Sequence, residues 1–106
     1  MSKLPAQYVS ISKRFKKYTK AVENLGKAAK DAGPIKKKTS HLIQMAAAAA
    51  IRSEGSVHSH ARQALQAGAS PEEIQHAIIL LSSTIGFPTV SAALSWVDDV
   101  IKGAKS

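Results

Sequence analysis

The chain has 106 residues, of which 44% are hydrophobic and 21% are charged, a composition typical of globular rather than disordered proteins. This length suits one hydrophobic core, so we expect a single domain over residues 1–106. The sequence contains no cysteine, which excludes disulfides, thiolate metal sites and thiol catalysis for this chain.

The net charge of +8 is concentrated at the N-terminal side. Residues 1–38 hold eleven of the fifteen basic residues and only two acidic ones, Glu23 and Asp31. Such a patch can attract nucleic acid, an anionic membrane surface or an acidic substrate. We favour a solvated face, because this segment has no groove-reading motif and no aromatic stacking platform. Nucleic acid is therefore not an expected partner.

The hydrophobic runs are too short to span a membrane. The longest one extends from Leu42 to Ile51 and is interrupted by Gln44. The N-terminus carries charges and Pro5 where a signal peptide would have an apolar segment. We therefore expect a soluble, cytoplasmic protein with no membrane partner.

A basic amphipathic helix is predicted first, over residues 6–31. Apolar residues recur there at spacings of three and four, with lysines on the other faces. Gly33-Pro34 is a stop signal, because proline cannot donate the next helical hydrogen bond. The apolar stripe consists of Tyr8, Ile11, Phe15, Tyr18, Val22, Leu25 and Ala29.

Four further helical segments follow in the remaining sequence. Residues 39–52 form an apolar helix, with Leu42, Ile43, Ala46, Ala47 and Ala50 on its expected buried side. Gly55 interrupts or bends the chain, and residues 56–67 form a helix that stops at Gly68.

The next helix has the strongest start signal. Ser70-Pro71-Glu72-Glu73 combines a serine cap, a proline at the first helical position and a glutamate three residues after the cap. The buried stripe expected to follow consists of Ile74, Ala77, Ile78 and Leu81. Gly86-Phe87-Pro88 breaks this helix, and the last helix follows with its buried face at Val90, Ala93, Leu94, Val97 and Ile101, before Gly103. No segment alternates as a strand would, so we expect an all-α protein, a compact bundle of five or six helices.

Three polar residues share one face at the start of the third segment. Ser56 and His60 are four residues apart, and Ser53 lies three residues before Ser56, so they follow one stripe of a helix. An imidazole and two hydroxyl groups are therefore expected close together.

One set of residues follows a characteristic spacing along the chain: His60, Ala64, Gly68, Ala69, the Ser70-Pro71-Glu72-Glu73-Ile74 cap, Gly86-Phe87-Pro88 and Ala92-Ala93. This spacing resembles that of the carboxymuconolactone decarboxylase family, including its alkyl hydroperoxidase D-like branch. The resemblance covers about Gly33 to Lys102 and leaves the basic first helix outside. It implies the alkyl hydroperoxidase D-like fold, self-association into a trimer or hexamer, a small-molecule substrate, and no cofactor or metal.

The resemblance also implies four catalytic positions. The peroxidase branch has two cysteines three residues apart, a histidine four residues later and a glutamate on the preceding helix, and these positions fall on Ser53, Ser56, His60 and His41. In that branch one thiolate attacks peroxide and the second thiol resolves the sulfenic acid, while the histidine and glutamate move protons. Serine can do neither sulfur step. We therefore predict an alkyl hydroperoxidase D-like protein that is inactive in thiol-dependent peroxide reduction.

The serines have two explanations: natural loss of thiol chemistry, or replacement of cysteines to prevent oxidation. We favour natural divergence, because His41 in place of the glutamate would not serve to prevent oxidation. Two other functions stay open. One is a decarboxylase-type enzyme with His60 as acid or base. Arg52 and Arg62 are candidates for binding a carboxylate there, but we favour solvent-facing roles for both. The other is a non-catalytic oligomeric binding module.

Structural roles are also open for these residues. Ser53 and Ser56 are candidate helix caps, and His60 is a candidate structural histidine bonded to Ser56. Catalysis by a serine nucleophile is disfavoured, since the spacing places no acid to orient His60. His58 and His60, two residues apart, point to different sides of a helix and are poor joint metal ligands.

Overall fold

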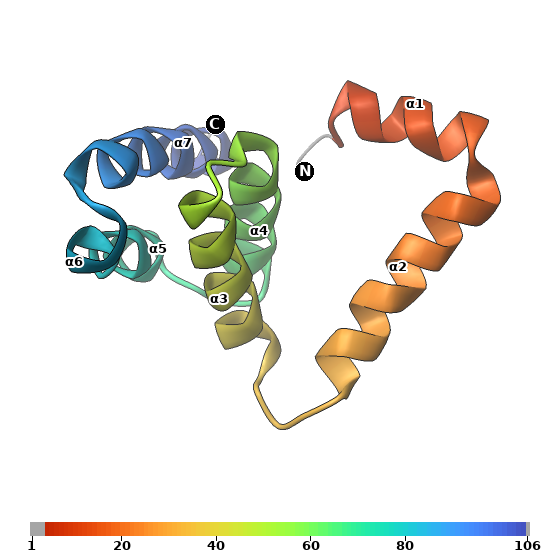
Figure 1. The fold of residues 1–106 in the computed structure, drawn as a ribbon, viewed down its shortest axis with the longest axis horizontal. Helices are drawn as coiled ribbons and strands as arrows, with labels where there is room; N and C mark the ends of the chain where they lie inside the picture. The colour runs from red at the N-terminus through yellow and green to blue at the C-terminus, as the bar shows by residue number, and fades with distance from the viewer. Residues whose placement is uncertain (1–3, 106) are drawn as a thin grey trace. The chain divides into compact units, whose positions relative to one another are not determined.

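The computed structural model describes residues 4–105, and all regular secondary structure in that range is helical (Figure 1). Six helices have nine residues or more and one, α6, has four. The predicted all-α class is therefore confirmed. The helices are α1 (Ala6–Arg14), α2 (Lys16–Asp31), α3 (Lys37–Ala50), α4 (Glu54–Gln66), α5 (Pro71–Ile79), α6 (Ser82–Ile85) and α7 (Phe87–Lys105).

The chain divides into two compact units after Ile35. The first unit holds α1 and α2, and the second, which we call the bundle, holds α3 to α7. Within residues 4–105, no helix combines the length and the apolar character needed to cross a membrane.

The first unit differs from the single helix predicted over residues 6–31. Phe15 has φ −130° and ψ 63°, outside the helical region, and separates α1 from α2. The two helices are joined by a hydrogen bond that the Tyr8 hydroxyl donates to Glu23 Oε2, and this bond to the carboxylate raises the pKa of Tyr8. The prediction of one continuous helix is therefore wrong. The sequence did not indicate the break, because the apolar spacing of three and four continues through Phe15 and no glycine or proline lies there.

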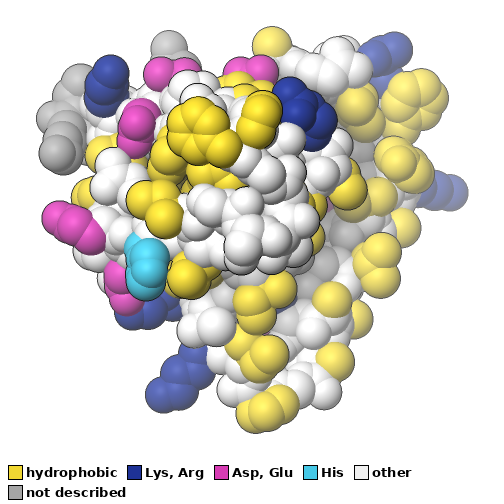
Figure 2. Space-filling view, turned by 60° about the vertical axis from the view of Figure 1, so that its left-hand side comes forward, with side chains coloured by type: hydrophobic (Ala, Val, Ile, Leu, Met, Phe, Trp, Pro, Cys, Tyr) yellow, Lys and Arg dark blue, Asp and Glu magenta, His cyan; other side chains and the backbone are white. Residues whose placement is uncertain are grey.

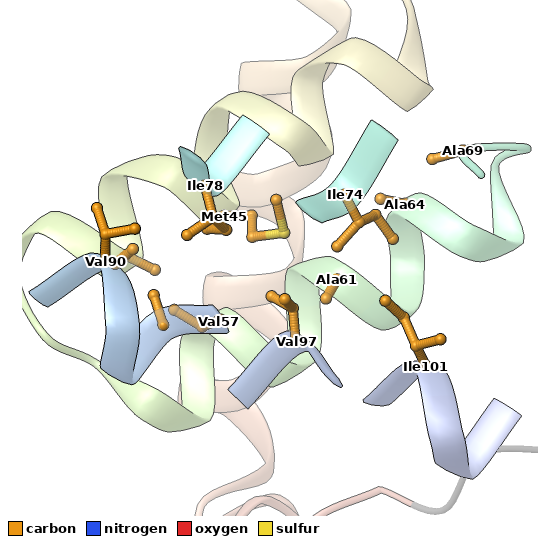
Figure 3. Close-up of a cluster of buried hydrophobic side chains, with 13 residues drawn as sticks. Met45, Val57, Ala61, Ala64, Ala69, Ile74, Ile78, Val90, Val97 and Ile101 are labelled. Atoms are coloured by element: carbon orange, nitrogen blue, oxygen red, sulfur yellow. The ribbon is translucent and has the colours of Figure 1, made fainter. Parts of the chain in front are cut away.

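The core of the bundle is a cluster of aliphatic side chains from α3, α4, α5 and α7 (Figure 3). The predicted inward faces of α5 and α7 are confirmed, with Ile74 and Ile78 on α5 and four residues on α7 buried. Burial of such side chains contributes roughly 1.5–3 kcal/mol each for the larger ones. The buried residues of the cluster are Met45, Ala48, Ala49, Val57, Ala61, Ala64, Ala69, Ile74, Ile78, Val90, Ala93, Val97 and Ile101.

The buried face of α3 is not the predicted one. Ile43, Ala47 and Ala50 are exposed, and of the predicted face Leu42 packs, partly buried, against the core. The buried positions are His41, Met45, Ala48 and Ala49. These positions follow the spacing of four, three and one that one helical face requires. The prediction failed because the run from Met45 to Ile51 is wholly apolar and contains no polar residue to mark the outer side.

The ends of α4 are partly as predicted. Gly55 lies in the first turn of α4, so it neither interrupts nor bends the chain there. Gly68 has φ +102°, a conformation that favours glycine, and the backbone N–H of Ala69 donates to Ala64 O at 2.9 Å. The predicted stop of α4 at Gly68 is therefore confirmed.

The start of α5 is also as predicted. Ser70 Oγ accepts from the Glu73 N–H at 3.0 Å, and Glu73 Oε1 accepts from the Ser70 N–H at 2.9 Å. This reciprocal pair satisfies two backbone donors that the first turn would otherwise leave open. The hydrogen bond from Ser70, and then Lys38 with its Nζ 3.2 Å from Glu73 Oε2, lower the pKa of Glu73.

Candidate functional site

The hairpin of α3 and α4 carries all four predicted site residues. The turn between the helices is short: Arg52 has φ +58°, and the Ser53 N–H donates to Ala48 O at 2.9 Å. A turn this short makes the two helices run antiparallel (Figure 1), so the first half of α3 lies beside the second half of α4. The turn thereby sets which side chains of α3 and α4 meet.

A pair of histidines lies at the contact between these two helices. His41 Nδ1 and His60 Nδ1 are 3.2 Å apart, and the ring centroids are separated by 5.4 Å with the planes tilted by 35°. A hydrogen bond between two imidazole nitrogens requires that one of them carries a proton and the other presents a lone pair. His41 is 1% exposed, whereas His60 is half-buried, so the pair extends from the core toward solvent.

The two serines lie nearer the turn. Ser56 is one helical turn before His60 in α4, so both side chains lie on the same face. Ser53 occupies the N-cap position of α4, but its side chain makes no capping hydrogen bond. Ser53 is therefore at the predicted N-cap position, but its hydroxyl does not cap the helix. Ser56 lies inside α4 and is not a cap. Both serines are half-buried.

The two candidate arginines have different surroundings. Arg52 is exposed, and its Nη1 donates to Thr89 Oγ1 at 2.7 Å, which links the hairpin turn to the first turn of α7. Arg62 is half-buried on α4, two residues after His60. Arg62 therefore projects from a different side of α4 than His60, and Arg52 lies at the turn end of the hairpin.

The other histidines lie apart from this pair. His58 Nε2 is 3.8 Å from Glu54 Oε2, one turn back along α4, and His76 is exposed on α5. Within residues 4–105, no three side chains from His, Asp and Glu are grouped in a way that could hold a metal ion.

The arrangement of His41 and His60 suits proton transfer. A general base works best when a neighbouring group holds its ring in one orientation and one tautomer. Because His41 engages Nδ1 of His60, proton exchange with a substrate would use Nε2 of His60. The hydroxyl groups of Ser53 and Ser56 can donate and accept hydrogen bonds on the same side of α4.

Comparison with known families identifies the chain's relatives. Residues 16–99 match the model of the carboxymuconolactone decarboxylase family, which is most of the chain. The chain belongs to this family. The family match begins at Lys16 and so includes α2, which corrects the sequence-based prediction that the resemblance starts near Gly33 and leaves the basic helix outside. None of the curated proteins compared with the chain matches it.

A solved structure from the same family has a similar fold. It is the crystal structure of the apo form of a carboxymuconolactone decarboxylase family protein from Legionella pneumophila, with a TM-score of 0.78 and 24% sequence identity. The likeness covers 91% of this chain and 86% of the other. At this identity the likeness shows the fold alone.

Two contacts at the site were not predicted from the sequence. The hydrogen bond between His41 and His60 depends on the antiparallel pairing of α3 and α4, which residue spacing within one helix does not reveal. Thr89, which binds Arg52, had no motif to single it out. His41 is the polar member of the buried face of α3, and a buried polar residue usually has a specific partner, but the sequence did not identify this face as the buried one.

Proposed function

We propose that this family member is an alkyl hydroperoxidase D-like protein without thiol peroxidase activity, whose site performs redox-neutral acid–base chemistry on a small carboxylate substrate. Decarboxylation is the reaction type that best suits it. The cysteine-free sequence supports the absence of thiol peroxidase activity, because serine at positions 53 and 56 cannot supply a thiolate or a reversible disulfide. Membership of the carboxymuconolactone decarboxylase family supports acid–base chemistry on a carboxylate substrate.

The observation that carries the proposal is the 3.2 Å contact between His41 Nδ1 and His60 Nδ1. It favours an acid–base role because the buried His41 fixes the ring of the half-buried His60, as the orienting residue does in acid–base pairs. A positioned histidine of this kind contributes typically about 10²–10⁴-fold to the rate.

The proposed step needs no oxidant or reductant. The bond between the substrate carbon and its carboxylate breaks, carbon dioxide leaves, and the electron pair of that bond enters a conjugated carbonyl group as an enolate. Protonated His60 then returns a proton to carbon, and the neutral imidazole regains its proton from solvent. Guanidinium groups bind carboxylates with two parallel hydrogen bonds. Arg62 lies two residues after His60 and so on a different side of α4, which leaves Arg52 as the candidate of the two for binding the substrate carboxylate.

A decarboxylation assay tests the acid–base half of the proposal. Release of carbon dioxide from carboxymuconolactone would be compared for the wild type, His60→Gln and His76→Gln. We expect His60→Gln to lower kcat about 10²-fold or more, while His76→Gln, on the exposed side of α5, leaves it unchanged. Equal rates for His60→Gln and the wild type would contradict the role of His60. The absence of turnover in the wild type would favour the non-catalytic module instead.

A peroxide assay tests the other half. The wild type should not consume peroxide in the presence of a dithiol reductant, whereas a Ser53→Cys, Ser56→Cys double variant restores the two sulfur positions. Peroxide consumption by the wild type would refute the proposal. Activity gained by the double variant would support the assignment of the serine positions, and the double variant remaining inactive would count against that assignment.

A further inference from the structure

The proposed acid–base step leaves the hydroxyl groups of Ser53 and Ser56 unused. Ser53 occupies the N-cap position of α4 without a capping hydrogen bond, and within residues 4–105 neither its hydroxyl nor that of Ser56 has a hydrogen-bond partner. Serine hydroxyl groups near helices usually bond to the local backbone, which satisfies them without a ligand. Four others in this chain do so, each donating to a carbonyl oxygen three or four residues earlier: Ser12, Ser40, Ser82 and Ser95.

The two open hydroxyl groups are spaced to meet at one ligand atom. Ser53 and Ser56 are three residues apart at the start of α4, and helix neighbours at this spacing have Cβ atoms about 5–6 Å apart. Two hydroxyl groups that each donate to one oxygen at about 2.8 Å lie at most about 5.6 Å from each other. The spacing therefore suits a single oxygen atom held between the two serines.

His60 lies one turn further along the same face. It follows Ser56 by four residues, which is about 6 Å along the helix axis. Glu54, the acidic residue in the first turn of α4, is directed elsewhere, since its Oε2 lies 3.8 Å from His58 Nε2. His58 and His60 are two residues apart and point to different sides of the helix. The carboxylate of Glu54 therefore does not compete for the two serine hydroxyl groups.

We propose that Ser53 and Ser56 donate hydrogen bonds to the carbonyl oxygen of the substrate and stabilise the enolate that forms there when carbon dioxide leaves. This role rests on the proposed decarboxylation. The electron pair of the breaking bond moves into the carbonyl group, whose oxygen becomes negative, while both serines keep their protons. Protonated His60 then gives its proton to carbon. Donors aimed at a developing negative charge are among the largest contributions to catalysis.

The two serines also define the class of substrate. A carboxylate alone is not sufficient, because the hydroxyl pair needs an oxygen that gains charge during the reaction. The substrate class is a carboxylic acid with a conjugated ketone or lactone carbonyl group, which takes up the electron pair. The hydroxyl pair would bind this carbonyl group at the start of α4, and His60 would reach the carbon that loses carbon dioxide.

Turnover of carboxymuconolactone by variants of the full chain provides the first test. Ser56→Ala should lower kcat at least about tenfold and leave KM nearly unchanged, because the hydrogen bond strengthens in the transition state. Ser56→Thr keeps a hydroxyl group and should retain most of kcat. Ser95→Ala is the matched control, since Ser95 is exposed on α7 and its hydroxyl donates to Ala92 O at 2.6 Å.

Two failures can be told apart in this assay. A wild type without turnover would overturn both the proposed function and the role of the serines. A wild type whose turnover is lost in His60→Gln but unchanged in Ser56→Ala would overturn the role of the serines alone.

Binding of tetronate provides a second test that needs no turnover. Tetronate is a stable lactone enolate, so it carries the charge that the two hydroxyl groups are proposed to stabilise. In an NMR titration, Ser53→Ala and Ser56→Ala should each raise its dissociation constant at least about tenfold, while Ser95→Ala leaves it unchanged.

Adsorption to an apolar surface is the competing explanation for tetronate binding. Figure 2 shows hydrophobic side chains gathered on the face of the bundle that carries α5, α6 and the start of α7. Leu80 is exposed at the end of α5, and Leu80→Ala should leave tetronate binding unchanged. Binding that is lost in Leu80→Ala but kept in Ser56→Ala would overturn the proposal, as would a wild type that does not bind tetronate.

Discussion

His41 and His60 come from different helices, yet their Nδ1 atoms lie 3.2 Å apart. The contact joins a residue at the start of α3 to one in the second half of α4, which requires the antiparallel hairpin described above. One ring must donate and the other accept, so the two imidazoles form one hydrogen-bonded unit. That unit is the basis of the proposed acid–base chemistry.

Removal of His41 should destabilise the bundle. His41→Ala leaves a cavity beside Met45 and removes the hydrogen bond to His60, so we expect the free energy of unfolding to fall by about 2–3 kcal/mol. His76→Ala, at an exposed position of α5, should change it by less than about 0.5 kcal/mol. Urea unfolding measures both. Equal effects for the two variants would show that His41 is not buried as described.

The orientation of α3 can be tested with two neighbouring alanines. Ala48 is buried and Ala47 is exposed, so Ala48→Leu should overpack the core and cost about 1–3 kcal/mol. Ala47→Leu should stay within about 0.5 kcal/mol of the wild type. Thermal unfolding of the two variants measures this difference. If Ala47 faced the core, as the sequence predicted, Ala47→Leu would be the more destabilising of the two.

Gly55 in the first turn of α4 and Gly68 just after its end should respond in opposite directions to alanine. Gly68 has φ +102°, so Gly68→Ala should cost about 1–2 kcal/mol through backbone strain, although open space surrounds the new methyl group. Gly55 lies in the first helical turn with no atom near its Cβ direction, so Gly55→Ala should gain up to about 1 kcal/mol. Denaturant unfolding gives the sign of each change. Destabilisation by both would refute the helical assignment of Gly55.

The capping box at the start of α5 should make part of the stability depend on pH. The pKa of Glu73 is lowered by the Ser70 N–H and by Lys38, so its contribution is present above the ordinary glutamate pKa of about 4.3 and is lost as the pH falls through the lower folded-state value. The difference in unfolding free energy between the wild type and Glu73→Gln should therefore be largest near neutral pH and shrink in acid. Glu72→Gln, on the same turn but outside the capping box, is the control. A difference that grows in acid would contradict this assignment.

The ends of helices could be predicted where a capping residue, a glycine or a proline marks them. Ser70 and Pro71 mark the start of α5, Gly68 the end of α4, and Gly33-Pro34 the end of the basic segment, because these residues act through their own backbone geometry or hydrogen bonds. The break at Phe15 carries no such signal.

Features that depend on packing between helices were not predictable in the same way. Which alanines of α3 face inward is decided by the neighbouring helices, since alanine is compatible with both faces. The resemblance pointed to His41 and His60 as separate site positions, but it contained no information on their direct contact. That contact follows from how α3 and α4 fold back on each other.

The imidazole nitrogens can be observed directly by long-range ¹H–¹⁵N NMR on the labelled chain. At neutral pH we predict one protonated and one unprotonated Nδ1 for His41 and His60, with scalar coupling between these two nitrogens that disappears in His41→Ala. If both Nδ1 atoms are in the same protonation state and no coupling connects them, the two histidines do not share a hydrogen bond and the proposed acid–base pair is wrong.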